Sequence, residues 1–148
     1  MSSANTVISP GSSLIFRVPA RLEDVRLLGI SVHSLFANMG FDDVESYQLE
    51  LAVTEAANNI VKHSYQFEKG LYFNMKLSVT EDRVTCTFMD TGKFENFLEN
   101  NKQGDIATDT TALPPNSRGI YIICKVMDEV SYKRSGEKNI LTLVKYLA

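Results

Sequence analysis

The chain has 148 residues, of which 44% are hydrophobic and 22% charged, and its formal net charge is −3. These values are ordinary for a single globular domain and exclude a chain that is disordered throughout. The negative net charge gives no general attraction to nucleic acid or to an anionic membrane, so we expect neither as a direct partner. A polyanion that binds here must meet a local site.

The cysteines and the amino-terminal segment indicate a cytoplasmic protein. Cys86 and Cys124 each lie in an apolar run, which favours buried free thiols over a disulfide or a metal pair. The two His and two Cys residues lack the spacing of a zinc site. Residues 1–13 lack the basic start and apolar core of a signal peptide. No apolar run approaches the roughly 20 residues that cross a bilayer.

The amino-terminal part predicts a tail, a strand and a helix. Residues 1–12 end in a Pro-Gly turn, so we expect a flexible tail followed by one domain at 13–148. The run SLIFRV at 13–18 predicts a strand that the next proline closes. Over 21–38, apolar side chains recur at every third or fourth position, which predicts an amphipathic helix. Its broad apolar stripe has two interpretations, packing on a sheet or a surface for a dimer or partner.

A second helix and a β-hairpin follow. Asp42 or Asp43 can cap a helix that runs to about Ser64. After Gly70, the runs LYFNMKLSV and RVTCTFMD alternate apolar and polar residues on either side of a turn. This alternation predicts an antiparallel hairpin.

The remainder predicts a long polar loop, a helix and two strands. Residues 91–117 are polar and long for a connection inside a compact domain, as functional lids often are, and FENFLEN at 94–100 predicts a helical turn within them. The apolar run at 118–130 predicts a helix, with strands near 130–133 and 140–146. We therefore predict an α/β (α+β) two-layer sandwich, with helices on one face of a mixed, mainly antiparallel sheet.

Glu55 and Asn59 are the first polar pair suited to phosphate chemistry. They lie four residues apart, so they project from one face of the predicted helix. A carboxylate can act as a general base, and an amide oxygen can ligate a hard cation such as Mg²⁺. On their own, the two residues could equally be solvated side chains on an exposed helix flank.

Two further motifs also allow a functional and a structural interpretation. Asp90 at a strand end can accept a hydrogen bond from an exocyclic amine such as that of adenine, and Gly92 lets the backbone approach a ligand closely. The alternative is a turn that simply ends the strand, because Asp and Gly are common in such turns. Ser117, Arg118 and Gly119 open the last predicted helix, where free N–H groups and a guanidinium can cradle phosphate. The alternative is an N-cap by Ser117 beside an exposed arginine.

The order of these motifs resembles one known superfamily. The strings VTEAANNIVKHSY, FMDTG and SRGIYIICKVMDEVSY occur in this order around a polar loop. They resemble the Bergerat-type ATP-binding domain shared by gyrase, Hsp90, histidine kinases and MutL. Within that superfamily, these strings are similar to the sequences of the anti-sigma-factor serine/threonine kinases of the sporulation and stress-response type. The resemblance extends from about residue 13 to the carboxyl terminus.

This resemblance implies a role for each residue in the first two motifs. Asn59 would hold Mg²⁺ against the ATP phosphates, and Glu55 would accept the proton of the substrate serine. Asp90, with Gly92 beside it, would bind the adenine amino group. His63 would lie near the nucleotide, with a partly buried structural histidine as the alternative.

The third motif and the departures from the family pattern concern the phosphates. Arg118 and Gly119 match the residues at the end of the lid that contact phosphate. Four residues depart from the family pattern. Phe94 and Ser117 stand where the family usually has glycine, and Lys138 and Asn139 stand in place of the usual Gly-Thr pair. These changes leave the adenine site intact and bear on the phosphate contacts and the kinase rate.

The function implied by the resemblance is an ATP- and Mg²⁺-dependent protein-serine/threonine kinase that is also an anti-sigma-type, partner-switching regulator. It would hold a sigma factor or another regulatory target in one state and phosphorylate a STAS-type anti-anti-sigma factor in the other, as a homodimer. Two alternatives remain, a nucleotide-dependent binding module without phosphoryl transfer and an activating subunit of a phosphatase. Glu55 favours the kinase, because a pure binder needs no base there.

Overall fold

The computed structural model describes residues 9–95, 98 and 115–147. Its sheet has the strand order β1-β2-β3-β5-β4, and every described pairing is antiparallel, which confirms the predicted mainly antiparallel sheet. The strands are β1 (Ser13–Pro19), β2 (Tyr72–Val79), β3 (Arg83–Asp90), β4 (Glu129–Ser135) and β5 (Lys138–Tyr146). The helical turn predicted at 94–100 and the tail at 1–12 fall largely outside the described residues.

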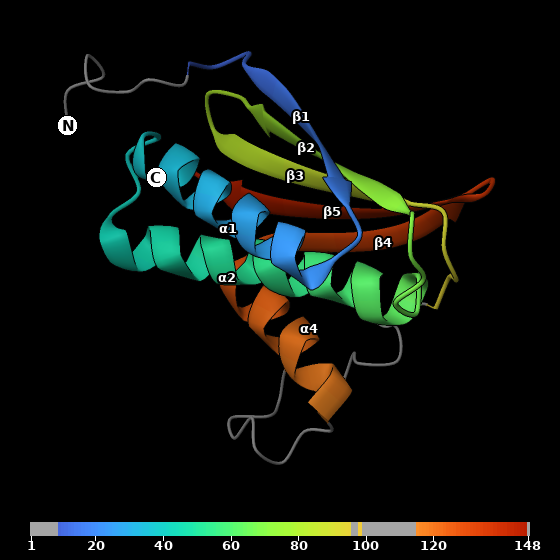
Figure 1. Ribbon diagram of the computed structural model, residues 1–148. Helices are drawn as coiled ribbons and strands as arrows, with labels where there is room; N and C mark the ends of the chain where they lie inside the picture. Colours follow the sequence, from blue (N-terminus) through green and yellow to red (C-terminus); the bar gives the residue numbers. More distant parts are fainter. Residues whose placement is uncertain (1–8, 96–97, 99–114, 148) are drawn as a thin grey trace.

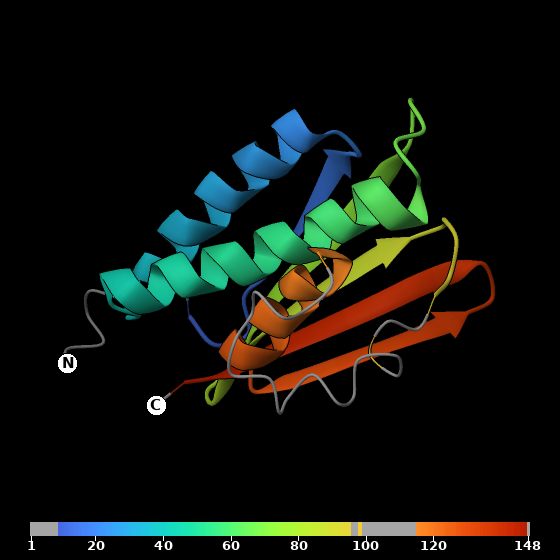
Figure 2. The same ribbon diagram turned by 90° about the horizontal axis from the view of Figure 1, so that it is seen from below.

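The helices cover one face of this sheet, so the predicted two-layer sandwich is confirmed (Figures 1 and 2). They are α1 (Leu22–Ala37), α2 (Asp43–Asn59), the π-helical turn η2 (Ile60–Ser64) and α4 (Pro115–Val126). Helices α1 and α2 lie side by side, and α4 packs against α2 (Figure 2). Within the described ranges, no helix is long and apolar enough to cross a membrane.

Helix α2 is fixed at its start by a capping box. The Asp42 side chain accepts the backbone N–H of Glu45 at 2.8 Å, and the Glu45 side chain reaches back to the Asp42 N–H at 3.4 Å. These bonds satisfy N–H groups that the first turn of a helix leaves free. Of the two predicted caps, Asp42 is therefore the one used. At the other end the backbone widens into η2, where the Tyr65 N–H bonds to the carbonyl of Ile60.

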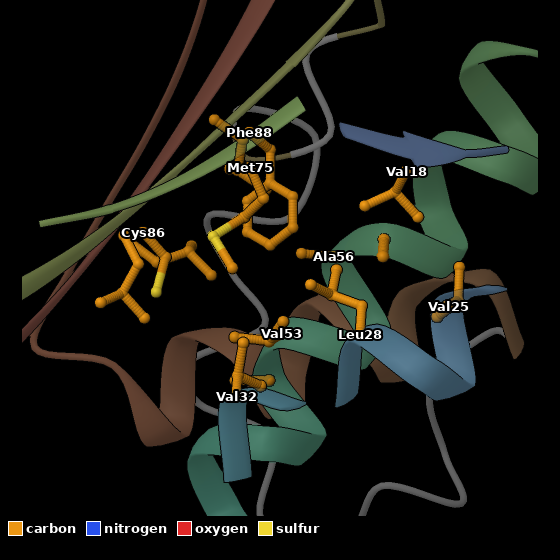
Figure 3. Packing of buried hydrophobic residues seen from close by; sticks show 14 of the residues in the cluster. Val18, Val25, Leu28, Val32, Val53, Ala56, Met75, Cys86 and Phe88 are labelled. Atoms are coloured by element: carbon orange, nitrogen blue, oxygen red, sulfur yellow. The ribbon is translucent and has the colours of Figure 1, made fainter. Parts of the chain in front are cut away.

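The hydrophobic core lies between the sheet and the helices. Figure 3 shows Met75, Cys86 and Phe88 of the sheet facing Val53 and Ala56 of α2. All five are at most 1% exposed. The small, fully buried Ala56 side chain allows the backbone of α2 to lie close to the sheet.

The two cysteines have different environments. Cys86 is a buried free thiol, as expected from its apolar run, and burial raises the pKa of this thiol to about 12. Cys124 is also free but exposed on α4, so the expectation of a buried thiol is wrong there. The apolar run around Cys124 is helical, and a helix turns part of any continuous run toward solvent.

Helix α4 differs from the sequence-based expectation at both ends. It begins at Pro115 rather than at Arg118 and ends at Val126 rather than at residue 130. Proline suits the first helical position because it has no N–H to leave unpaired. Gly119 is therefore the fifth residue, and its N–H lies within the hydrogen-bonded turns. The predictions of a helix start at Arg118–Gly119, with Ser117 as N-cap, are wrong.

Candidate functional site

The end of β3 packs on the end of the α2–η2 helix. A Cβ at Gly92 would lie 2.4 Å from the backbone carbonyl oxygen of Ser64. The Lys93 N–H donates to that same oxygen at 2.9 Å. The turn after Asp90 is therefore held against the helix that carries Asn59, at a distance that only glycine permits.

Helix α4 packs on the same helix about two turns closer to its amino terminus. A Cβ at Gly119 would lie 2.5 Å from the Glu55 carboxylate oxygen Oε2. Glu55 is half-buried, and its carboxylate points toward α4. The contacts of Gly92 and Gly119 thus bring the second and third sequence motifs onto the helix that carries the first.

Asp90 is a buried carboxylate at the end of β3, with only 5% of the residue exposed. Its Oδ1 accepts the backbone N–H of Gly92 at 2.9 Å and the Nδ2 of Asn139 at 2.8 Å. Burial raises the pKa of Asp90, and these two donors, the Ser64 hydroxyl and the charge of Arg134 act against that rise. Such a carboxylate can accept a hydrogen bond from a ligand amine in a dry environment, where the bond is strong.

Asn59 presents an unpaired amide. Its Nδ2 is buried and has no hydrogen-bond partner among the described residues. Buried polar groups are nearly always paired, so an unpaired one needs an explanation such as an absent ligand. A phosphate oxygen would accept from this nitrogen, and the amide oxygen beside it is a hard ligand that suits Mg²⁺. The side chain therefore fits a magnesium-bound phosphate group.

Two candidate residues are at the surface. His63 lies in the wide turn η2 and is exposed, and Arg118 is exposed in the first turns of α4 beside Gly119. The structure thus packs the turn after Asp90 and the start of α4 against the helix that carries Glu55 and Asn59, and leaves His63 and Arg118 exposed.

Asn139 and Arg134 also contribute to this site. The sequence showed Asn139 only as a departure from the family pattern, expected to affect the phosphate contacts, and did not single out Arg134; the structure places Asn139 against Asp90 instead. Asn139 is 0% exposed and contacts Asp90 directly, and Arg134 donates to its amide oxygen at 2.9 Å. A signal was present, since an asparagine at an inward position of a strand that continues as ILTLV is unusual.

Replacing Gly92 by Ala is expected to lower the free energy of unfolding by about 1–3 kcal/mol, because the new methyl group would overlap a backbone carbonyl that cannot rotate away. Urea unfolding measures this loss. Gly119→Ala is the matched control, since its Cβ meets only the flexible end of the Glu55 side chain and should cost less. Equal losses of stability in the two variants would contradict this account of Gly92.

Comparison with known proteins identifies the family of the chain. Residues 18–145 match the model of the histidine kinase-like ATPase domain. The serine-protein kinase RsbW of Staphylococcus aureus is 31% identical over 138 residues, covering 88% of this chain and 84% of the relative. RsbW of Bacillus cereus is 29% identical over 136 residues, covering 88% and 82%.

Two solved structures share the fold. The SiaB–SiaC complex of Pseudomonas aeruginosa matches with a TM-score of 0.59 at 14% identity, covering 90% of this chain and 89% of that one. The RsbU and RsbW domains of a Mycobacterium tuberculosis protein match with a TM-score of 0.63 at 14% identity, covering 92% of this chain and 32% of that one. The chain therefore belongs to the histidine kinase-like ATPase domain family, in the branch of the anti-sigma-factor serine-protein kinases that its motifs predicted.

Proposed function

We propose that this protein binds Mg-ATP between the α2–η2 helix and the end of β3 and transfers the γ-phosphoryl group to a serine or threonine of an anti-anti-sigma-type partner. One observation carries the proposal. Gly92 and Gly119, from distant parts of the sequence, both pack on the helix of Glu55 and Asn59. ATP would supply the phosphoryl group, and Mg²⁺ would reduce the charge of its phosphates.

Each buried polar group then has a defined task. Asp90 accepts the exocyclic amine of adenine, and the unpaired amide of Asn59 binds phosphate and the metal ion. Glu55 accepts the proton of the attacking hydroxyl as the phosphoryl group is transferred. The exposed guanidinium of Arg118 and the imidazole of His63 are free to contact the phosphates of bound nucleotide.

The outer surface of the helix layer supports the binding of protein partners. Leu27 and Ile30 of α1 are 60% and 59% exposed, and Val44 and Tyr47 of α2 are 66% and 59% exposed. Large apolar side chains exposed in this way can contact protein partners. We propose that this surface serves partner switching, with a sigma factor or similar target in one state and the kinase substrate in the other, in a homodimer.

The test is incubation of the purified chain with labelled ATP, Mg²⁺ and a STAS-type protein that it co-purifies with. Label on a serine or threonine of that protein supports the kinase. A stable, nucleotide-dependent complex in which the partner never acquires label would instead support the binding module. Pull-downs with ATP and with ADP test the switch, since the proposal requires the bound partner to differ between them.

Asn59→Ala is expected to weaken Mg-ATP binding by about 10- to 100-fold, because the ligand loses a hydrogen bond to a charged group and a metal-ligand oxygen. Calorimetry with ATP in the presence of Mg²⁺ measures the change. Asn58→Ala on the same helix is the control and should bind as the native chain does. An unchanged affinity in Asn59→Ala would refute the metal and phosphate role.

A further inference from the structure

Three polar side chains form a row across three neighbouring strands, next to the proposed base-binding residue. Asn139 of β5 stands in register with Asp90 of β3 on one side and with Arg134 of β4 on the other. Directly opposed residues in a sheet point to the same face. All three therefore lie on the helix-covered face, where Asn139 and Asp90 are buried.

The amide of Asn139 can adopt only one orientation. Its Nδ2 donates to Asp90 Oδ1 at 2.8 Å, to the Gly92 carbonyl at 3.0 Å and to the Lys93 carbonyl at 3.3 Å. Its Oδ1 accepts from Arg134 at 2.9 Å. Carbonyls and an ionised carboxylate only accept, and a guanidinium only donates, so a flipped amide would lose every one of these bonds.

Arg134 holds both Asn139 and the turn after Asp90. Besides Asn139, its guanidinium donates to the Gly92 carbonyl at 3.2 Å and to the Gly136 carbonyl at 3.1 Å. Both backbone polar groups of Gly92 are thus hydrogen-bonded, its N–H to Asp90 and its carbonyl to Asn139 and Arg134. The position of the Asp90 carboxylate therefore depends on the β5 and β4 strands as well as on its own turn.

Both amide N–H donors to Asp90 meet the same oxygen, Oδ1. In the described part of the chain, no amide donates to Oδ2. Two donors fix Oδ1 and so set the plane of the carboxylate. The Ser64 hydroxyl is a third donor to Asp90, and because a carboxylate has about four acceptor positions, Oδ2 can still accept from a ligand.

We propose that Asn139, held in place by Arg134, is a positioning residue for base recognition: it occupies Oδ1 of Asp90 and so presents Oδ2 to the exocyclic amine of adenine. This inference rests on the proposed function, in which Asp90 contacts the base. Asn139 and Arg134 do not touch the ligand themselves, so they act on nucleotide binding and leave phosphoryl transfer from bound ATP unchanged.

The same contacts make nucleotide binding sensitive to pH. Burial raises the pKa of Asp90, while the Gly92 N–H, Asn139, the Ser64 hydroxyl and the charge of Arg134 lower it. Among the described residues, the ionisable side chains of Arg17, Tyr65, Tyr72 and Lys138 line one pocket with Asp90. Tyr132 of β4 also feels the Asp90 charge, and burial together with that charge raises its pKa to about 12, so it stays neutral near pH 7. Removing the Asn139 donor therefore shifts the loss of ATP binding on acidification to higher pH.

Asn139→Ala and Arg134→Gln test the proposal through steady-state kinetics at varied ATP and through calorimetric ATP binding at a series of pH values. In Asn139→Ala the KM for ATP is expected to rise about 10-fold, with kcat at saturating ATP unchanged, because about one charge-assisted hydrogen bond is misplaced. Arg134→Gln is the second variant, in case Asn139→Ala does not fold. Because Arg134 is exposed, this replacement should leave the fold intact, and it is expected to raise the KM for ATP by a few-fold.

Lys133→Gln is the matched control, because it removes the same charge from the neighbouring position of β4, which points to the opposite face of the sheet. It should keep the native KM and pH dependence. If Asp90→Asn binds ATP as tightly as the native chain, the proposed function itself fails. If Asp90→Asn loses binding but Arg134→Gln and any folded Asn139→Ala keep the native KM and pH profile, only the positioning role is overturned.

Discussion

Asp90→Asn is expected to weaken ATP binding by about 10- to 100-fold without lowering the thermal stability of the protein near pH 7. The variant amide keeps an oxygen for the Gly92 and Asn139 donors, but its NH₂ then takes the place of Oδ2. An amine of the base would meet a donor instead of an acceptor. The loss of affinity is thus a matter of hydrogen-bond polarity rather than of shape.

The stability part of this prediction follows from the pKa of Asp90, which burial raises above its ordinary value. A carboxyl with a raised pKa in the folded state favours folding while it is protonated, and this contribution is lost as the pH rises through the folded-state pKa. Near pH 7 the ionised group therefore opposes folding, and replacing it by a neutral amide removes that cost. The stability advantage of Asp90→Asn should shrink on acidification.

Calorimetric titration with ATP and thermal unfolding at several pH values measure the two effects. Asp43→Asn, which removes an exposed charge from the first turn of α2, is the control and should bind ATP normally. An Asp90→Asn protein with native ATP affinity would mean that the base binds elsewhere. A large fall in its melting temperature would show that the buried charge stabilises the fold, against the argument above.

Glu55→Gln is expected to lower the rate of phosphoryl transfer by about 100- to 10,000-fold, the range that general base catalysis contributes. Glutamine keeps the size of the side chain and its contact with Gly119, but its amide cannot take up a proton from an attacking hydroxyl. ATP binding should be nearly unchanged, because Glu55 acts on the hydroxyl and not on the nucleotide. Single-turnover transfer of label from ATP measures the rate, and calorimetry measures the binding.

Glu50→Gln provides the matched control for this variant. Glu50 lies on the same helix, and its carboxylate bonds to His33 of α1, away from the nucleotide site. Its replacement should leave transfer at the native rate. If Glu55→Gln transfers phosphate as fast as the native chain, the catalytic base is another group. If it loses ATP binding to the same degree, Glu55 belongs to the nucleotide pocket and not to the chemistry.

The elements that local patterns specify were predictable from the sequence. The apolar spacing in 21–38 predicted α1, and the alternation of apolar and polar residues predicted β2 and β3. The acidic pair Asp42 and Asp43 predicted the start of α2. In each case the signal lies within one element and follows from which side chains must be buried. The candidate site followed in part, because Glu55 and Asn59 share one helix and their spacing alone puts them on one face.

What the sequence did not reveal depends on contacts between distant segments. The role of Asn139 requires the register of β5 against β3 and β4, which no local pattern contains. The early start of α4 at Pro115 had a local signal, a proline at a first helical position, but it lies within a polar stretch that otherwise reads as a loop. Exposure of Cys124 likewise depended on which side of α4 faces the core.

The π-helical turn at Ile60–Ser64 has a consequence for chain length. Its wider coil sets the direction in which the Ser64 carbonyl points, and that carbonyl receives the Lys93 N–H at 2.9 Å. The alignment of the turn after Asp90 with Asn59 is therefore set by how many residues separate Asn59 from Ser64 more than by which residues they are. Within this segment, related chains can tolerate exchanges of side chains far more readily than an insertion or a deletion.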